Sequence, residues 1–427
     1  RFGSGNRRQR EKQRASDNGL ETMQTLVRKV MEEQLPSSNT EGETQGWVAE
    51  EALRRRHALA QFIEEYTPWL LPRFAPLFDY FGLTASESKT KLESKQDNKI
   101  PTLQAAAQYV ATLERRIVDT PVTHAEGSSL SALATELGSL LPETRERLSR
   151  LHAAIANIAA RAEQCAEAME FGFLLVESRQ LLSIAYDGNT GEIHSACYDL
   201  LASEARIAAL LAIAKGDVPQ QSWFRLSRSH VIVNGRAALL SWTGTMFEYM
   251  MPALWMKTYP DTLISRSLQA AVRIQRDYVR DIPWGISESG FAETEASGRY
   301  RYQAWGIPSL ALKYGAADGP VISPYSTFLT LSLLRNDALA NLRRMASMNW
   351  TGAYGFYEAA DFTQGKQPRL VRSWMAHHQG MSLLAVANLL HDSIVQEWFH
   401  ANPCVRATQL LLHEKPLSKD MLNSLKK

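Results

Sequence analysis

"SLSALATELGSLLPETRERLSRLHAAIANIAARAEQCAEAMEF" occupies residues 129–171 and consists almost entirely of strong helix formers. Ala, Leu, Glu and Arg dominate it, and its apolar residues recur at the three- and four-residue spacing of a helix that buries one face. The stretch "LQAAAQYVATLERRIVD" at residues 103–119 has the same character. The sequence therefore predicts long stacked helices over residues 99–170, and an all-α protein.

Composition narrows the class of protein. The chain has 427 residues, is 45% hydrophobic, and carries 47 basic against 45 acidic residues. A nearly balanced charge provides no global field for nucleic acid or anionic lipid, so we expect no nucleic-acid partner. Apolar runs are far shorter than the roughly 20 residues that a membrane-spanning helix requires. The three cysteines, Cys165, Cys197 and Cys404, lack CxxC spacing and indicate neither disulfides nor a thiolate zinc site.

Changes in composition along the chain suggest five segments. We expect a flexible basic tail at 1–20, a helical region with a charged linker at 21–98, long helices at 99–170, a catalytic region at 171–416 and a short tail at 417–427. Because the first residue is Arg1, we expect the chain to be a piece of a longer or processed protein.

The region after residue 171 alternates helices with loops. Turn chemistry at Asp187-Gly188-Asn189 predicts one β-hairpin, and apolar spacing predicts helices at about 200–214, 241–256, 261–280, 324–347 and 373–390. The loops between the later helices are rich in Gly, Pro and aromatic residues. This alternation predicts a helical toroid whose loops line a mouth.

Two glutamates lie in such aromatic loops. Glu288 is part of "PWGISESGF" and Glu358 is part of "YGFYEAADF". Cleavage of a glycosidic bond needs two carboxyl groups, one that gives a proton to the leaving oxygen and one that attacks carbon or activates water. Burial against aromatic rings separates the pKa values of such a pair. The alternative is structural, since either glutamate could cap a helix or pair with Arg299, Arg301 or Arg372.

Further candidates surround these loops. In "SWMAHHQGMSLLAVANLL", the adjacent His377 and His378 project about 100° apart on a helix, which is a poor arrangement for a metal. They are either core or capping residues, or hydrogen-bond sugar hydroxyls together with Gln379. "SWTGTMFEYMMP" places Trp242, Phe247 and Glu248 at a helix start, as a packed terminus or as a subsite wall. No dinucleotide-binding, P-loop or GxSxG motif is present, so we expect no cofactor and no metal.

Seven stretches, in chain order, carry a resemblance to a known family. They are "YDLLASEARIAALLAIAKGDVP", "WTGTMFEYMMP", "PWGISESGF", "YQAWGIPSLALK", "SPYSTFL", "YGFYEAADF" and "MAHHQGMSLL". Together, from about Phe171 to Pro416, they resemble the glucoamylase-like portion of bacterial cyclic β-1,2-glucan synthases. The resemblance implies an (α/α)6 barrel and a retaining transglycosylase that closes linear β-1,2-glucan into a ring. By motif, Glu288 resembles the general acid/base and Glu358 the nucleophile.

The resemblance also implies substrate contacts and a setting. The residues expected to shape the subsites are Trp242, Phe247, Glu248, Trp284, Tyr302, Gln303, Tyr357, Asp361, His377, His378 and Gln379. The expected partners are a β-1,2-glucan chain and the glycosyltransferase and phosphorylase-like regions of a full-length synthase. That synthase would lie on the cytoplasmic side of the inner membrane, with the periplasm as the alternative. Two other functions stay open: an inverting endo-β-1,2-glucanase of the same fold, and a non-catalytic glycan-binding helical module.

Overall fold

The computed structural model describes residues 26–31, 43–81, 103–119, 128–312 and 319–416. Its internal contacts divide the chain into two compact units, Arg1–Ala168 and Met169–Lys427. The predicted tails at 1–20 and 417–427 lie outside the described residues, as does the predicted charged linker. The five predicted segment boundaries remain predictions.

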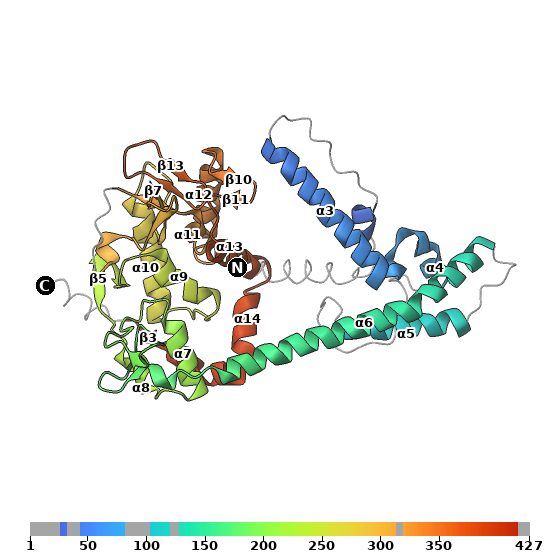
Figure 1. Ribbon diagram of the computed structural model, residues 1–427, viewed down its shortest axis with the longest axis horizontal. Coiled ribbons are helices and arrows are strands. Elements are labelled where there is room, and N and C mark those ends of the chain that lie inside the picture. The colour runs from blue at the N-terminus through green and yellow to red at the C-terminus, as the bar shows by residue number, and fades with distance from the viewer. Residues whose placement is uncertain (1–25, 32–42, 82–102, 120–127, 313–318, 417–427) are drawn as a thin grey trace, which may run out of the picture. The chain divides into compact units, whose positions relative to one another are not determined.

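The described part of the first unit is helical, as the sequence predicted. Its elements are α3 (Glu43–Tyr66), η1 (Pro68–Leu70), η2 (Pro72–Phe74), α4 (Ala75–Tyr80), α5 (Leu103–Asp119) and α6 (Ser128–Ala168). Helix α5 packs along the early part of α6 (Figure 1). Val110 and Leu113 of α5 and Leu137 and Leu141 of α6 are all buried in one apolar cluster. Burial of these side chains stabilises the pairing of the two helices.

The second unit contains shorter helices separated by loops. They are α7 (Arg206–Lys215), α8 (Gln221–Arg225), α9 (Met246–Met250), α10 (Leu263–Tyr278), α11 (Pro324–Phe328), α12 (Arg335–Ser347), α13 (Ala376–Leu390), α14 (Ile394–Ala401) and α15 (Pro403–Thr408), with 3-10 turns η5 (Gly172–Leu174), η6 (Met251–Leu254), η7 (Pro308–Leu310) and η8 (Gln409–His413). The predicted all-α class of the (α/α)-barrel type is confirmed.

Three predicted helices are shorter than expected, and the one predicted at about 200–214 begins only at Arg206, as α7. The stretch 241–256 forms α9 and η6 only, because Thr245 caps the helix at its first residue and Pro252 lacks the N–H that a longer helix would use. The stretch 324–347 divides into α11 and α12. Between them the hydroxyl of Thr330 donates to the carbonyl of Thr327, and this local bond competes with the helical pattern.

Hairpins are more numerous than the one predicted. The predicted turn is confirmed between β3 (Tyr186–Asp187) and β4 (Glu192–Ile193), where the carboxylate of Asp187 accepts the N–H of Asn189. The other strands are β1 (Leu175–Val176), β2 (Leu181–Leu182), β5 (His230–Val233), β6 (Arg236–Leu239), β7 (Ser289–Thr294), β8 (Tyr300–Gln303), β9 (Val321–Ile322), β10 (Thr351–Gly352), β11 (Gly355–Phe356), β12 (Ala359–Asp361) and β13 (Arg369–Val371). β12 pairs antiparallel with β9 on one side and β13 on the other.

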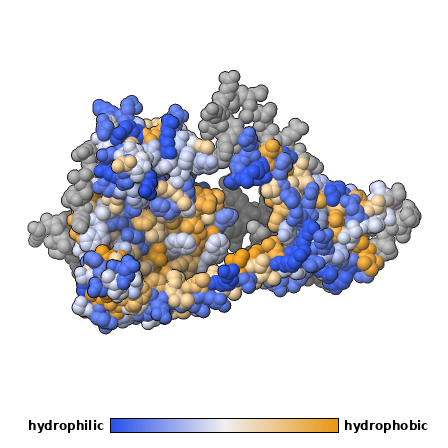
Figure 2. Space-filling view, viewed as in Figure 1, coloured by the Kyte–Doolittle hydropathy of each residue, from blue (hydrophilic) through white to orange (hydrophobic). Residues whose placement is uncertain are grey.

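One large core joins the helices and loops of the second unit. It includes Leu210 on α7, Tyr249 on α9, Val272 on α10 and Ala360 on β12, each fully buried. On the face drawn in Figure 2, hydrophilic and hydrophobic residues are interspersed. Among the described residues, no helix combines the length and the apolar character needed to cross a bilayer.

Candidate active site

The two candidate glutamates lie at the starts of two neighbouring strands. Glu288 immediately precedes β7, and Glu358 immediately precedes β12. The backbone N–H of Gly290 on β7 donates to the Glu358 carboxylate at 3.2 Å, across 68 residues of sequence. The tertiary structure therefore brings together the two loops that the sequence singled out.

Glu358 is a buried carboxylate with several hydrogen-bond partners. The residue is 2% exposed. The Nδ1 atom of His378 lies 2.9 Å from both of its carboxylate oxygens, and the hydroxyl of Ser323 donates to its main-chain carbonyl at 2.7 Å. A buried carboxylate is costly without partners, and Nδ1 of His378 and the N–H of Gly290 provide them, while Ser323 holds the backbone of the residue. Its position and orientation are thus fixed by β7, α11 and α13.

Tyr325 on α11 connects the two glutamates, and the sequence analysis missed it. Its ring stacks on that of His378, and its hydroxyl hydrogen-bonds to Ser287 and donates to the main-chain carbonyl of Glu288. Burial is the main cause that raises the pKa of this phenol well above its usual value, so the hydroxyl stays protonated. The motif "SPYSTFL" pointed to this segment, but nothing in it indicated which side chain faces the site.

Tyr302 and His377 complete the polar group. The hydroxyl of Tyr302 lies 3.3 Å from Nε2 of His377 and 3.5 Å from Nε2 of His378. Burial, then interaction with the Glu288 carboxyl group and the charge of Glu358, raises the pKa of Tyr302. Burial, followed by the neighbouring His378, lowers the pKa of His377. Near neutral pH the site therefore combines a protonated phenol and a neutral imidazole beside two carboxyl groups.

A third carboxyl group, also missed in the sequence analysis, lies near this cluster. Glu204 follows Ser203, whose hydroxyl donates to it at 3.2 Å. Burial is the largest cause that raises its pKa, and the charges of Glu248 and Glu288 act in the same direction. The "SEAR" stretch at 203–206 lies in the helix predicted at about 200–214 and in the first stretch of the resemblance, and neither pattern singled out Glu204.

Glu248 is part of a packed helix terminus, which was the predicted alternative to a subsite wall. Its carboxylate accepts hydrogen bonds from the hydroxyls of Ser241, Thr243 and Thr245, and Thr245 and Glu248 form a capping box at the start of α9. Phe247, one residue earlier, donates its N–H to the hydroxyl of Ser287 beside Glu288. This bond joins the start of α9 to the loop that carries the candidate acid.

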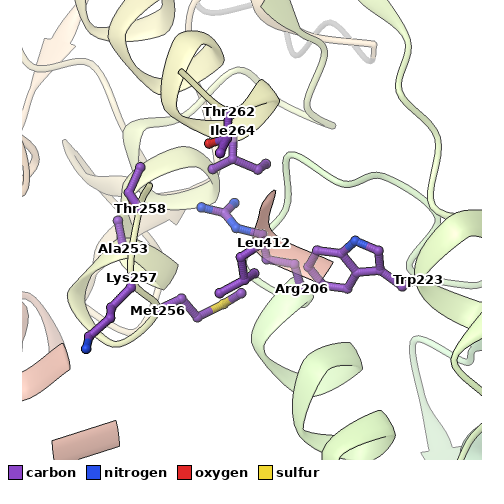
Figure 3. Close-up of a pocket in the computed structure, with 9 residues that line it drawn as sticks. All are labelled: Arg206, Trp223, Ala253, Met256, Lys257, Thr258, Thr262, Ile264 and Leu412. Atoms are coloured by element: carbon purple, nitrogen blue, oxygen red, sulfur yellow. The ribbon is translucent and has the colours of Figure 1, made fainter. Parts of the chain in front are cut away.

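The opposite end of α9 is held by a buried arginine. The guanidinium of Arg206 donates to the carbonyls of Ser203, Glu248 and Tyr249. Figure 3 shows its side chain in a small pocket, pointing toward Thr262 and Ile264. Burial lowers the pKa of Arg206 to about 9. The carbonyls of Glu248 and Tyr249 are among those that a helix leaves free at its C-terminus, so Arg206 anchors α9.

Other predicted subsite residues have clear structural contacts. The buried carboxylate of Asp361 accepts the N–H of Ala292 on β7 and both the N–H and the hydroxyl of Thr363. The indole of Trp284 is buried in a small cluster with Leu331. These contacts stabilise the strands and the loop around the glutamates.

The remaining predicted residues border the same loops. Tyr357 packs on Trp374, with the Arg372 guanidinium 5.9 Å from its ring centre. The amide of Gln379 donates to the Phe356 carbonyl at 3.4 Å, Gln303 ends β8 opposite Ser289, and Trp242 is half-buried before α9. Direct contact of any of them with sugar remains a prediction.

The site gathers two carboxyl groups and neutral hydrogen-bonding side chains at the loops of a helical fold, as a carbohydrate-active enzyme requires. Residues 197–403 match the family model described as putative glucoamylase. Over 262 residues the chain is 44% identical to the cyclic β-(1,2)-glucan synthase NdvB of Rhizobium meliloti. That alignment covers 60% of this chain and 9% of the much longer relative.

Solved structures of low sequence identity also align. A putative glucoamylase from Bacteroides fragilis has 15% identity and a TM-score of 0.44, over 93% of this chain and 86% of its own. A β-1,2-glucanase from Parabacteroides distasonis has 12% identity and a TM-score of 0.44, over 93% of this chain and 54% of its own. The roles of individual residues rest on the contacts of the present site.

Proposed function

We propose that this chain is a retaining β-1,2-glucan transglycosylase that cleaves a linear glucan and closes it into a ring. The observation that carries the proposal is the buried Glu358 carboxylate, which His378 and Gly290 hold beside the loop of Glu288. The 44% identity to a cyclic β-(1,2)-glucan synthase supports the choice of substrate and of product.

Glu358 is the proposed nucleophile of the first step. Its carboxylate oxygen forms a bond to the anomeric carbon while the bond from that carbon to the leaving oxygen breaks. Glu288 gives its proton to the leaving oxygen, and the cut end of the glucan departs. Burial of Glu358 shields its carboxylate from bulk water.

The second step reverses these roles. Glu288, now ionised, takes a proton from a hydroxyl of the sugar at the other end of the same chain. The hydroxyl oxygen then forms a bond to the anomeric carbon, and Glu358 leaves as a carboxylate. No water is consumed, so the ring differs from a linear product of the same size by the mass of one water.

Incubation of the chain with linear β-1,2-glucan tests the proposal. Mass spectrometry distinguishes rings from linear products, and NMR of the first product reports whether the anomeric configuration is retained. We expect rings, and we expect Glu288→Gln and Glu358→Gln each to lower the rate at least about a hundredfold, the range of acid/base loss. The matched control is Glu293→Gln, since Glu293 on β7 is exposed and pairs only with Arg301 in the described contacts.

Three outcomes would contradict the proposal. Short linear products with inverted configuration would identify an endo-β-1,2-glucanase. Binding of glucan without turnover would identify a non-catalytic glycan-binding module. Turnover that neither glutamine substitution reduces would show that the catalytic pair is elsewhere.

We also infer a setting within a longer protein. The alignment covers 9% of its relative, which leaves room there for regions that build or shorten the glucan. On the resemblance, glycosyltransferase and phosphorylase-like regions would be the partners, at the cytoplasmic side of a bacterial inner membrane. Protease accessibility of the native full-length protein in sealed spheroplasts tests this location.

A further inference from the structure

We propose that His378 is a positioning residue for Glu358 and that, through the hydroxyl of Tyr302, it links this carboxylate to Glu288. The inference deepens the proposed function and rests on it for the roles of the two glutamates. It differs from the expectation that His378 contacts sugar, because His378 is 1% exposed and the ring of Tyr325 stacks on it with ring centres 3.7 Å apart.

The contacts of His378 determine which nitrogen carries its proton. An ionised carboxylate only accepts hydrogen bonds. Nδ1 lies 2.9 Å from both oxygens of Glu358, so Nδ1 must be the donor. In a neutral imidazole the other nitrogen, Nε2, is then an acceptor, and the atom that faces it is the hydroxyl of Tyr302.

Tyr302 has three possible partners within reach: the Glu288 carboxyl group, Nε2 of His377 at 3.3 Å and Nε2 of His378 at 3.5 Å. Its protonated hydroxyl interacts with the carboxyl group of Glu288 and lies 3.5 Å from Nε2 of His378. The latter distance is long for a hydrogen bond, and contacts of this kind commonly shorten when substrate binds. One hydroxyl carries one proton, so Tyr302 donates either to Glu288 or toward the histidines.

The protonation state of Glu288 decides between these orientations. When Glu288 is protonated, it donates to the oxygen of Tyr302, and the proton of Tyr302 is free to turn toward the two histidines, Nε2 of His378 among them. A hydrogen bond accepted at Nε2 strengthens the one donated from Nδ1, which favours negative charge on Glu358. When Glu288 is ionised, Tyr302 turns back to it. The link therefore supports an ionised nucleophile while the acid holds its proton, and releases that support after the proton has left.

The groups that face His378 are few and come from four elements. They are Glu358 before β12, Tyr302 on β8, Tyr325 on α11 and His377 beside it on α13. Both tyrosines stay protonated and His377 stays neutral near pH 7, as described above. Among the described residues, Glu358 is thus the one carboxyl group in direct contact with His378.

An NMR experiment tests the tautomer without any turnover. The histidine side chains are labelled with 15N in the full 427-residue chain. The signals of His378 are assigned by their loss in His378→Asn, and their chemical shifts report whether each nitrogen is protonated. We expect Nδ1 protonated and Nε2 unprotonated at pH 7. The Nε2 signal should shift in Tyr302→Phe, whereas His391→Asn, at the exposed end of α13, should leave it unchanged.

Kinetics test the positioning role. His378→Ala removes the donor to Glu358, so the acid limb of the kcat/KM profile should move to higher pH, and kcat should fall about 10- to 100-fold. His378→Asn offers an amide donor in place of Nδ1. It should therefore recover part of the lost kcat and return the acid limb part of the way to its original pH. Tyr302→Phe should move both the acid limb and the basic limb of the kcat/KM profile to higher pH, because the Glu288 carboxylate also loses a donor. His391→Asn is the control for both limbs.

The outcomes separate this inference from the proposed function. The inference is wrong if NMR shows that Nε2 of His378 is protonated and Nδ1 is not. It is also wrong if kcat falls in His378→Ala and Tyr302→Phe while both limbs of the kcat/KM profile keep their original pH. Absence of glucan turnover in the unmodified chain contradicts the proposed function but leaves the NMR result to decide on the link.

Discussion

The imidazole of His378 and the phenol ring of Tyr325 are stacked face to face, with ring centres 3.7 Å apart and planes inclined by 8°. The stack fixes the plane of the imidazole, and with it the direction of the bond from Nδ1 to Glu358. The hydroxyl of the same tyrosine holds the main-chain carbonyl of Glu288. One side chain of α11 thereby orients both halves of the site.

Tyr325→Phe keeps the stack and removes the hydroxyl. The buried hydroxyl of Ser287 and the carbonyl of Glu288 each lose a partner, so we expect the free energy of unfolding to fall by about 1–3 kcal/mol. Tyr325→Leu also loses the ring stack, so its free energy of unfolding should be lower by about a further 0.5–1.5 kcal/mol. Guanidinium unfolding measures both. Tyr186→Phe removes an exposed hydroxyl and is the control; equal stability of Tyr325→Phe and the unmodified chain would contradict this account.

Gly285→Ala tests the backbone of the Glu288 loop. Gly285 has φ +136°, and a Cβ placed there would lie 2.7 Å from the hydroxyl oxygen of Ser326. We expect the free energy of unfolding to fall by about 1–3 kcal/mol, since an L residue is strained in this conformation. Differential scanning calorimetry would show a lower Tm.

A matched control for Gly285→Ala is available on helix α13. Gly380→Ala meets no atom within 4 Å and replaces glycine inside a helix, so it should raise stability by up to about 1 kcal/mol. A Tm that rises in Gly285→Ala would show that the loop relaxes freely, and the proposed role of this glycine would be wrong.

His400 should make stability depend on pH. Its Nε2 accepts the backbone N–H of Lys257 at 3.0 Å, which only an unprotonated nitrogen does. Burial first, then the charge of Lys257, lowers its pKa from the usual 6.5. The unfolded chain therefore binds a proton more readily, and stability falls as the pH decreases from about 6.5 through the folded-state pKa.

Urea unfolding at pH 7, 6 and 5 measures this dependence. His400→Gln has no titrating group there and should show a smaller loss of stability between pH 7 and pH 5 than the unmodified chain. His391→Gln changes an exposed histidine and should keep the original slope. Identical slopes for the unmodified chain and His400→Gln would exclude His400 as the group responsible.

The sequence predicted those features that depend on local order. Helix formers at 129–171 indicated long helices because propensity and apolar spacing act over a few turns, and Asp187 indicated its hairpin because a turn is closed by its own residues. Glu288 and Glu358 stood out because a charged residue among aromatics is visible in the sequence itself. The general class of fold and the candidate pair therefore followed from the residues alone.

Only the tertiary structure decided what each polar side chain faces. Glu358 meets Gly290 across 68 residues, and Tyr325 on α11 stacks on His378 on α13. The Asp361 carboxylate accepts hydrogen bonds from Ala292 on β7 and from Thr363. These contacts depend on how distant segments pack, and no local pattern encodes them. The sequence thus shows which side chains could do chemistry, and the packing of distant segments determines which of them are in contact.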